Sequence, residues 1–203
     1  MELWEHCRSF GMINRDLVMY TFHKICQSVS KIHSLQLVHR DLKPENMFLS
    51  KDKKRVILID FGSAEDLENP QLRKMKIDND PRRMSHLNFV GTSQYMAPEC
   101  VRNKGEPTLK HDSWSLGCIL YQLETGLLPF RGGSDYLIFR RSTESRFNVN
   151  FPKEILTEKA KVLITKCLQV DPEKRPTIEE ILADPYFDGV SDIQEPPQLR
   201  DWE

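Results

Sequence analysis

The sequence has no long hydrophobic run, no excess of charge of one sign and no signal-peptide pattern. No apolar stretch approaches the roughly 18 residues of a membrane-spanning helix, so no membrane segment is expected. Lysine and arginine total 29 against 30 for aspartate and glutamate, so no nucleic acid or anionic membrane is expected as the partner. Residues 1–6 show neither the basic start nor the apolar stretch of a secretory signal.

Cysteines are few, widely spaced and odd in number. The five thiols fit neither a disulfide framework nor a zinc pattern, which indicates a reducing compartment. We therefore expect a cytoplasmic location, with the nucleus as a second one. Apolar residues make up 39% of the chain and charged residues 29%, as in ordinary globular proteins. At 203 residues the chain is long enough to bury a full core.

Hydrophobic periodicity predicts a mainly helical protein. Apolar residues at three- and four-residue steps predict an amphipathic helix over about 16–33. Residues 112–123 are apolar on nearly every face and predict a buried helix that Gly126 and Pro129 end. Two short apolar runs around a polar turn predict a small hairpin. The hairpin runs are 47–49 and 56–59; further helices are expected over 2–9, 134–145, 157–169 and 176–183, and an extended tail over 188–203.

Three short motifs carry the chemical information. Residues 39–46 read His-Arg-Asp-Leu-Lys-Pro-Glu-Asn, residues 60–62 read Asp-Phe-Gly and residues 97–99 read Ala-Pro-Glu. An isolated Asp-Phe-Gly arises easily by chance, but the full octet followed by both triplets at this spacing does not. Together they indicate phosphoryl transfer from ATP to a protein hydroxyl.

The side chains of these motifs suit that reaction, which needs alignment and charge neutralisation more than covalent help. Asp41 can accept the proton of an incoming hydroxyl, and Lys43 can reach the moving phosphoryl group. Asn46 and Asp60, at the two ends of the predicted hairpin, offer the oxygen ligands that Mg²⁺ takes alongside phosphate oxygens. Arg40 is expected to pair with a negative group.

Residues 63–90 are polar, charged and without period. A segment of this length inside a domain is usually functional or disordered. Its basic residues between 73 and 83 form either a solvated loop face or a docking site for an acidic or phosphorylated segment. Trp114, in contrast, is expected in the core and not against a ligand.

On these motifs the chain resembles the C-terminal lobe of eukaryotic Ser/Thr protein kinases. Within the AGC group it is most similar to the 3-phosphoinositide-dependent protein kinases. The narrower resemblance is carried by residues 88–99, 116–123 and 129–139, and the similarity covers essentially the whole chain. It implies the α+β kinase fold with a helical C-terminal lobe, protein Ser/Thr substrates, and ATP and Mg²⁺ as cofactors.

The resemblance also implies roles at the nucleotide. Asp41 corresponds to the catalytic base, with Lys43 and Asn46 as its partners, and Asp60 to the main Mg²⁺ ligand. Glu2 and Phe48 complete the set. Glu2 matches an acidic position that touches the ATP ribose, and Phe48 lies where a leucine usually forms the adenine floor.

Further residues are implied in support of the site. Thr92 matches the threonine that hydrogen-bonds the catalytic aspartate and lysine, which argues against a tyrosine kinase. By the resemblance, residues 63–90 fall where the kinase activation segment belongs, and Glu99 and Arg175 match a buried ion pair that anchors the end of that segment. Asp112 is expected to hold the backbone of the catalytic loop. Structural or regulatory roles are also expected for His39, Arg40, Phe61 and Gly62.

Three features depart from the resembled kinases. None of the nine glycines forms a Gly-x-Gly-x-x-Gly motif, and no strand lysine with a helix glutamate partner is present; those parts cover and pin the ATP phosphates. Asn88 stands where the activating phosphoserine is expected, which leaves Arg40 without its usual partner unless Ser85 substitutes. The activation segment also carries an insertion around 68–82. We expect residues 1–187 to be the kinase C-terminal lobe alone, without the N-terminal β lobe.

The retained catalytic motifs and the missing glycine-rich motif leave two possible functions. The first is the catalytic lobe of an ATP-dependent Ser/Thr kinase, with little activity in isolation; its substrates include, by resemblance, other AGC kinases. The alternative is a non-catalytic kinase-like binding module or decoy. No lipid-binding domain is expected in the chain.

Overall fold

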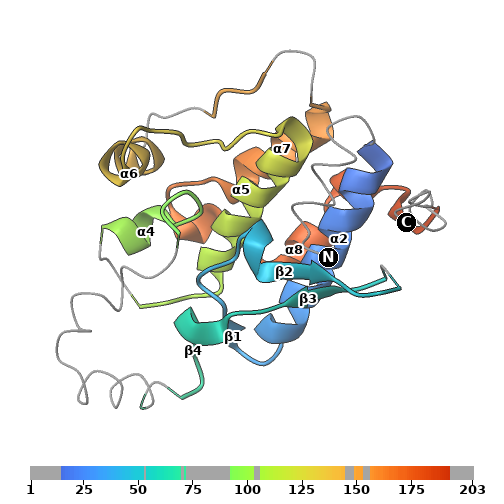
Figure 1. Cartoon of the computed structure of the whole chain (residues 1–203), viewed down its shortest axis with the longest axis horizontal. Coiled ribbons are helices and arrows are strands. Elements are labelled where there is room, and N and C mark those ends of the chain that lie inside the picture. The colour runs from blue at the N-terminus through green and yellow to red at the C-terminus, as the bar shows by residue number, and fades with distance from the viewer. Residues whose placement is uncertain are drawn as a thin grey trace.

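The computed structural model describes residues 15–52, 54–69, 71, 92–102, 106–144, 149–152 and 156–192. The helix expected over 2–9, the basic cluster at 73–83, and Glu2, Ser85 and Asn88 lie outside these residues. Helices dominate the described part, as Figure 1 shows, and the predicted mainly helical fold is confirmed. The helices are α2 (Arg15–His33), α4 (Pro98–Val101), α5 (Lys110–Thr125), α6 (Asp135–Thr143), α7 (Glu158–Cys167) and α8 (Ile178–Leu182).

Helix α5 runs through the middle of the lobe. It is buried along nearly its whole length, as its all-round apolar sequence predicts, and it packs against α7 and α2. Gly117 permits the close approach to α7, because a Cβ there would lie 2.6 Å from the Cβ of Cys167. Gly126 ends the helix in a left-handed conformation, with φ 69°, and its N–H donates to Gln122 O at 2.8 Å.

Helix α2 buries one face against the core and against α8. Phe22, Ile25 and Val29 have no exposed surface, as the three- and four-residue spacing predicts. The Phe22 ring stacks on Phe187 at a centroid distance of 5.8 Å, which joins the helix to η6. The 3₁₀ turns are η2 (Pro44–Asn46), η3 (Phe61–Ser63), η5 (Pro172–Lys174), η6 (Pro185–Phe187) and η7 (Val190–Asp192).

Two small antiparallel sheets lie beside α2. The predicted hairpin is present as β2 (Met47–Leu49) and β3 (Val56–Leu58), with Met47 opposite Leu58. A second pair joins β1 (Leu37–Val38) to β4 (Glu65–Asp66), with Val38 opposite Glu65. Strands of two residues show no periodicity, so the sequence did not reveal this second pair. It brings the chain after residue 62 back against the segment that leads into residue 39.

The tail departs from the prediction where it is described. An extended course was expected from residue 188, but Val190–Asp192 form the 3₁₀ turn η7 next to α2. Gly189 permits the change of direction with a φ of 85°. No helix in the described ranges combines the length and the apolar character needed to cross a membrane.

Candidate active site

A buried carboxylate fixes the backbone at the start of the loop of residues 39–46. Asp112, in the first turn of α5, accepts hydrogen bonds from the backbone N–H groups of His39 at 2.9 Å and Arg40 at 3.0 Å. His33, at the end of α2, contacts the same carboxylate at 2.8 Å. Arg40 takes a left-handed backbone conformation with φ 67°. The surroundings hold this conformation, because a residue with a Cβ adopts it at a cost of about 1–3 kcal/mol.

Burial and hydrogen bonding act in opposite directions on Asp112. Burial favours the neutral carboxylic acid, but hydrogen bonds from His33 and from two backbone N–H groups favour the carboxylate. The hydrogen bonds prevail and lower the pKa of Asp112 below its ordinary value. The loop therefore rests on a charged group at neutral pH.

Asp41 lies at the centre of a connected set of polar side chains. Its Oδ2 accepts a hydrogen bond from Lys43 Nζ at 2.8 Å, and its Oδ1 accepts from the N–H and hydroxyl of Thr92 at 2.9 and 3.0 Å. Lys43 Nζ also donates to the Thr92 hydroxyl at 2.8 Å. Asn46 Nδ2 donates to Asp41 O at 2.9 Å and to Oδ2 at 3.1 Å. The carboxylate is thus fixed in position yet keeps part of its surface open to solvent, with 10% of the side chain exposed.

Asn46 and Asp60 come together at the open end of the β2–β3 hairpin. The backbone N–H of Ile59 donates to Asn46 O at 3.0 Å, so Asp60 follows directly beside it. Asp60 has a left-handed backbone with φ 59°, and its Oδ1 accepts from Gly62 N at 3.3 Å. The Asn46 amide donates from its nitrogen to Asp41, and no donor among the described residues bonds its oxygen.

This donor set fits Mg²⁺. The ion takes few protein oxygens and completes its shell with water and phosphate, and one amide oxygen with one exposed carboxylate matches that requirement. The described residues contain no cluster of three or more His, Cys, Asp or Glu side chains that would hold a metal without substrate.

His39 and Phe61 pack against each other above the loop. The His39 ring, fully buried, lies 4.8 Å from the Phe61 ring centroid and donates from Nε2 to Ile59 O at 3.0 Å. Phe61 itself is 44% exposed. Phe48, on β2, is half-buried. An apolar surface therefore remains beside the loop.

Arg40 does not lack a partner. Its Nη1 lies 3.0 Å from Oε1 of Glu65, and both side chains are almost fully buried. Asn88 and Ser85, on which the expected loss of the usual phosphoserine partner depends, lie outside the described residues, so that prediction stays a prediction; Glu65 is a partner that the sequence did not suggest. The β1–β4 pairing brings a carboxylate from the start of the activation segment to the guanidinium.

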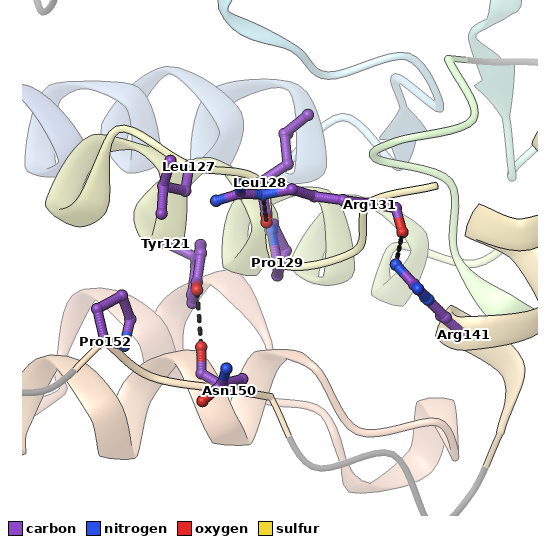
Figure 2. A pocket seen from close by; sticks show the side chains of 8 residues that line it. All are labelled: Tyr121, Leu127, Leu128, Pro129, Arg131, Arg141, Asn150 and Pro152. Atoms are coloured by element: carbon purple, nitrogen blue, oxygen red, sulfur yellow. Dashed lines mark hydrogen bonds between the residues drawn. The ribbon is translucent and has the colours of Figure 1, made fainter. Parts of the chain in front are cut away.

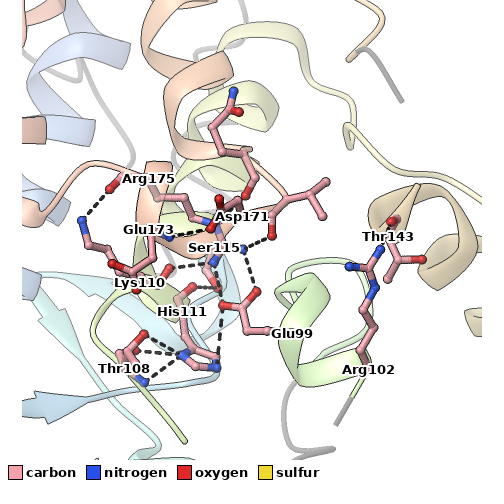
Figure 3. A network of polar contacts seen from close by, with 12 residues as sticks. Glu99, Arg102, Thr108, Lys110, His111, Ser115, Thr143, Asp171, Glu173 and Arg175 are labelled. Carbon is pink, nitrogen blue, oxygen red and sulfur yellow. Dashed lines mark hydrogen bonds and ion pairs between the residues drawn. The ribbon is translucent and has the colours of Figure 1, made fainter. Parts of the chain in front are cut away.

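Glu99 and Arg175 form a second buried centre, drawn in Figure 3. Arg175 donates from Nη1 and Nη2 to the two carboxylate oxygens at 2.7 and 2.6 Å. It also donates to the carbonyl oxygens of Gln169 and Lys110, and its guanidinium lies 5.0 Å above the Trp114 ring. The pair connects α4, which follows Thr92, to the helical part of the lobe.

Comparison with known proteins agrees with this geometry. The protein kinase domain model matches residues 1–187. The chain belongs to the protein kinase domain family. The expected similarity to 3-phosphoinositide-dependent kinases is also confirmed, and the family as a whole uses ATP and Mg²⁺.

Three relatives show the extent of the match. Human 3-phosphoinositide-dependent protein kinase 1 is 34% identical over 98% of this chain and 35% of its own length. Human putative 3-phosphoinositide-dependent protein kinase 2 is 34% identical over 98% of this chain and 49% of its own length. Serine/threonine-protein kinase PDK1 of Cryptococcus neoformans var. grubii is 36% identical over 93% and 14% respectively. The chain thus spans less than half the length of these relatives.

A cavity of about 440 Å³ lies elsewhere on this kinase domain, beyond the end of α5. Figure 2 shows Leu127, Leu128 and Pro129 on one side and Asn150 on the other, where Asn150 O accepts from the Tyr121 hydroxyl at 2.8 Å. None of the residues predicted for the active site lines it.

Sequence reasoning missed two residues of the kinase site. Glu65, the partner of Arg40, belongs to none of the sequence motifs. His33, which contacts Asp112, was predicted only as the end of an amphipathic helix. A buried charge near the start of a two-residue strand gives no local signal. Only the packing of α2 and β4 against the catalytic loop shows their partners.

Proposed function

We propose that this chain is the catalytic lobe of an ATP-dependent protein serine/threonine kinase. The single observation that carries the proposal is the Asp41 carboxylate, which Lys43, Asn46 and Thr92 hold together at 2.8–3.1 Å. Residues 1–187 form the kinase lobe and residues 188–203 its tail. Its substrates are serine or threonine side chains of proteins, other AGC kinases among them, and it acts in the cytoplasm. The described cysteines, which are all free and buried, are compatible with that compartment.

In the proposed reaction Asp41 accepts the proton of the incoming hydroxyl. Its two oxygens are oriented by Thr92 and Lys43 before substrate arrives, so little reorganisation is needed at the moment of transfer. Lys43 Nζ, which donates to Asp41 and to the Thr92 hydroxyl, is positioned to neutralise charge on the moving phosphoryl group. Bound ATP supplies that group, and Mg²⁺ offsets the charge of its phosphates.

Asn46 and Asp60 would hold the metal through their side-chain oxygens. The hairpin end fixes their spacing, since the Ile59 N–H bond to Asn46 O joins the two segments. Phe48 and Glu2 would contact the adenosine part of ATP. Asp112 acts through the backbone it supports, and Glu99 with Arg175 keeps the Thr92 side of the site in place.

The experiment adds a glycine-rich phosphate-covering motif, which does not occur within these 203 residues. A protein-kinase N-terminal lobe that carries the glycine-rich motif is fused to this chain, and phosphate transfer to a serine- or threonine-containing protein is measured with ATP and Mg²⁺. We expect transfer that Asp41→Asn lowers at least about 10³-fold, as removal of a catalytic group does. Lys24→Ala, on the exposed face of α2, serves as the control and leaves transfer unchanged.

A folded fusion that binds ATP but transfers no phosphate would contradict the proposal. Binding of a protein partner by that inactive fusion would then favour the alternative of a non-catalytic module.

A further inference from the structure

We propose that Glu65 is a positioning residue. Through its ion pair with Arg40 it joins the catalytic loop, residues 39–46, to the segment that begins with the metal ligand Asp60. The anion beside Arg40 is then supplied by the chain itself, and this part of the site is ordered without phosphorylation of the activation segment. The inference deepens the proposed function and rests on it.

The first observation is the depth of the pair. Arg40 Nη1 and Glu65 Oε1 are 3.0 Å apart, and their side chains are only 3% and 7% exposed. Two charges withdrawn from water lose hydration that their attraction has to offset, so good geometry is essential. Arg40 is thus an interior cation that needs a carboxylate beside it.

The second observation is where the two residues lie. Arg40 directly precedes Asp41, and its N–H is fixed by Asp112. Glu65 lies in β4, shortly after Asp60 and the turn η3. Its backbone is opposite Val38 of β1. The side-chain pair and the strand pair therefore fasten the same two segments, one carrying the hydroxyl-orienting carboxylate and the other the metal ligand.

The third observation concerns the anion. The guanidinium already meets a carboxylate at hydrogen-bonding distance inside the protein. A phosphate group brought to Arg40 would have to displace Glu65 or share its site, with repulsion between the two anions. The uncharged Asn88, which stands at the position expected for a phosphoserine, agrees with a site completed by Glu65.

The test is amide hydrogen exchange on the 203-residue chain, with Glu65→Ala and the isosteric Glu65→Gln. We expect exchange over residues 37–46 and 60–67 to become at least about tenfold faster, with α5 and α7 unchanged, because local opening precedes global unfolding. Glu65→Asp, which keeps the charge, recovers part of the protection. Glu158→Ala removes an exposed ion pair with Lys161 and is the matched control, with no change expected.

Added anion separates a role of charge from one of packing. Sodium acetate or inorganic phosphate is expected to restore protection in Glu65→Ala and to leave the unaltered chain unaffected. Equal protection in Glu65→Gln and the unaltered chain overturns the proposal, as does rescue by neither anion. If Glu65→Ala does not fold, the comparison of Glu65→Gln with Glu65→Asp decides the matter alone.

A second readout uses the fusion protein described above. Glu65→Gln is expected to lower kcat about tenfold with little change in the KM for ATP, and phosphatase treatment of the unaltered fusion leaves its activity intact. Loss of activity on phosphatase treatment overturns the phosphate-independent part of the proposal. Because hydrogen exchange needs no phosphoryl transfer, an inactive fusion with the expected exchange pattern refutes the kinase function and not the role of Glu65.

Discussion

Glu99 and Arg175 lie 76 positions apart in the sequence and meet in a two-pronged ion pair with bonds of 2.7 and 2.6 Å. The Arg175 side chain is completely buried, and it also donates to three backbone carbonyl oxygens, those of Lys110, Gln169 and Val170. A planar guanidinium satisfies all these acceptors at once, which an ammonium cannot do. The pair fixes the end of the activation segment to the helical core.

Replacing Arg175 should therefore destabilise the fold strongly. Arg175→Lys keeps the charge but loses the bidentate contact and several carbonyl bonds, and we expect the free energy of unfolding to fall by about 3 kcal/mol. Urea unfolding followed by circular dichroism measures it. Lys174→Ala, which removes an exposed pair with Asp171, should cost no more than about 1 kcal/mol. Equal losses of stability in Arg175→Lys and Lys174→Ala would contradict a stabilising role of the Glu99–Arg175 ion pair.

Asp112→Asn should loosen the catalytic loop and lower stability by about 2–4 kcal/mol. The loss follows because charge-assisted hydrogen bonds to His39, Arg40 and His33 disappear. The measurement is again urea unfolding at pH 7. Asp188→Asn is the control, since its carboxylate pairs with Lys159 at the surface and should contribute about 0–1 kcal/mol.

Asp112 should also make the free energy of unfolding decrease at acid pH. Burial alone would raise the pKa of Asp112, yet its hydrogen bonds lower it below the ordinary 3.8. A depressed carboxylate pKa contributes stability that is fully present above about pH 4 and is lost as the pH falls through the folded-state value. The stability difference between the unaltered chain and Asp112→Asn should shrink as the pH falls below about 4. A difference that grows below pH 4 would refute this.

Gly117→Ala should destabilise the protein although alanine favours helices. The added Cβ would lie 2.6 Å from the Cβ of Cys167 and 2.9 Å from Cδ2 of Leu168, so α5 and α7 would have to separate. We expect a net loss of about 1–3 kcal/mol, since overpacking outweighs a helix-propensity gain of about 1 kcal/mol. Gly133→Ala meets nothing within 4 Å and should change the unfolding free energy by less than about 0.5 kcal/mol.

The apolar surface beside the loop should bind a hydrophobic dye. Phe61 is 44% exposed, Ile57 49% and Ile59 38%, and all three lie along one stretch of chain. Phe61→Ser should reduce dye fluorescence. Leu35→Ser removes an exposed leucine at 65% exposure elsewhere and serves as the control. No dye binding by the unaltered chain would argue against an exposed apolar patch.

Local patterns determined the elements that bury one face or all faces. In α2, apolar side chains at three- and four-residue spacing indicate that one face is buried. In α5, the all-round apolar sequence indicates that the whole helix is buried. Both helices are present in the structure with that burial. Gly126 ends α5 because a left-handed residue is needed there. The octet, with Asp60-Phe61-Gly62, also determined the family, since the chemistry needs those residue types in that order.

Tertiary structure alone decided which distant side chains meet. The partner of Arg40 is 25 positions away, and it depends on a two-residue strand pair that no periodicity reveals. Thr92 reaches Asp41 across 51 positions, and His33 reaches Asp112 across 79. Such contacts are set by how separately formed segments pack, because burying a charge is tolerated only where its partner arrives. The sequence therefore determined the reacting groups, and the packing decided what holds them in place.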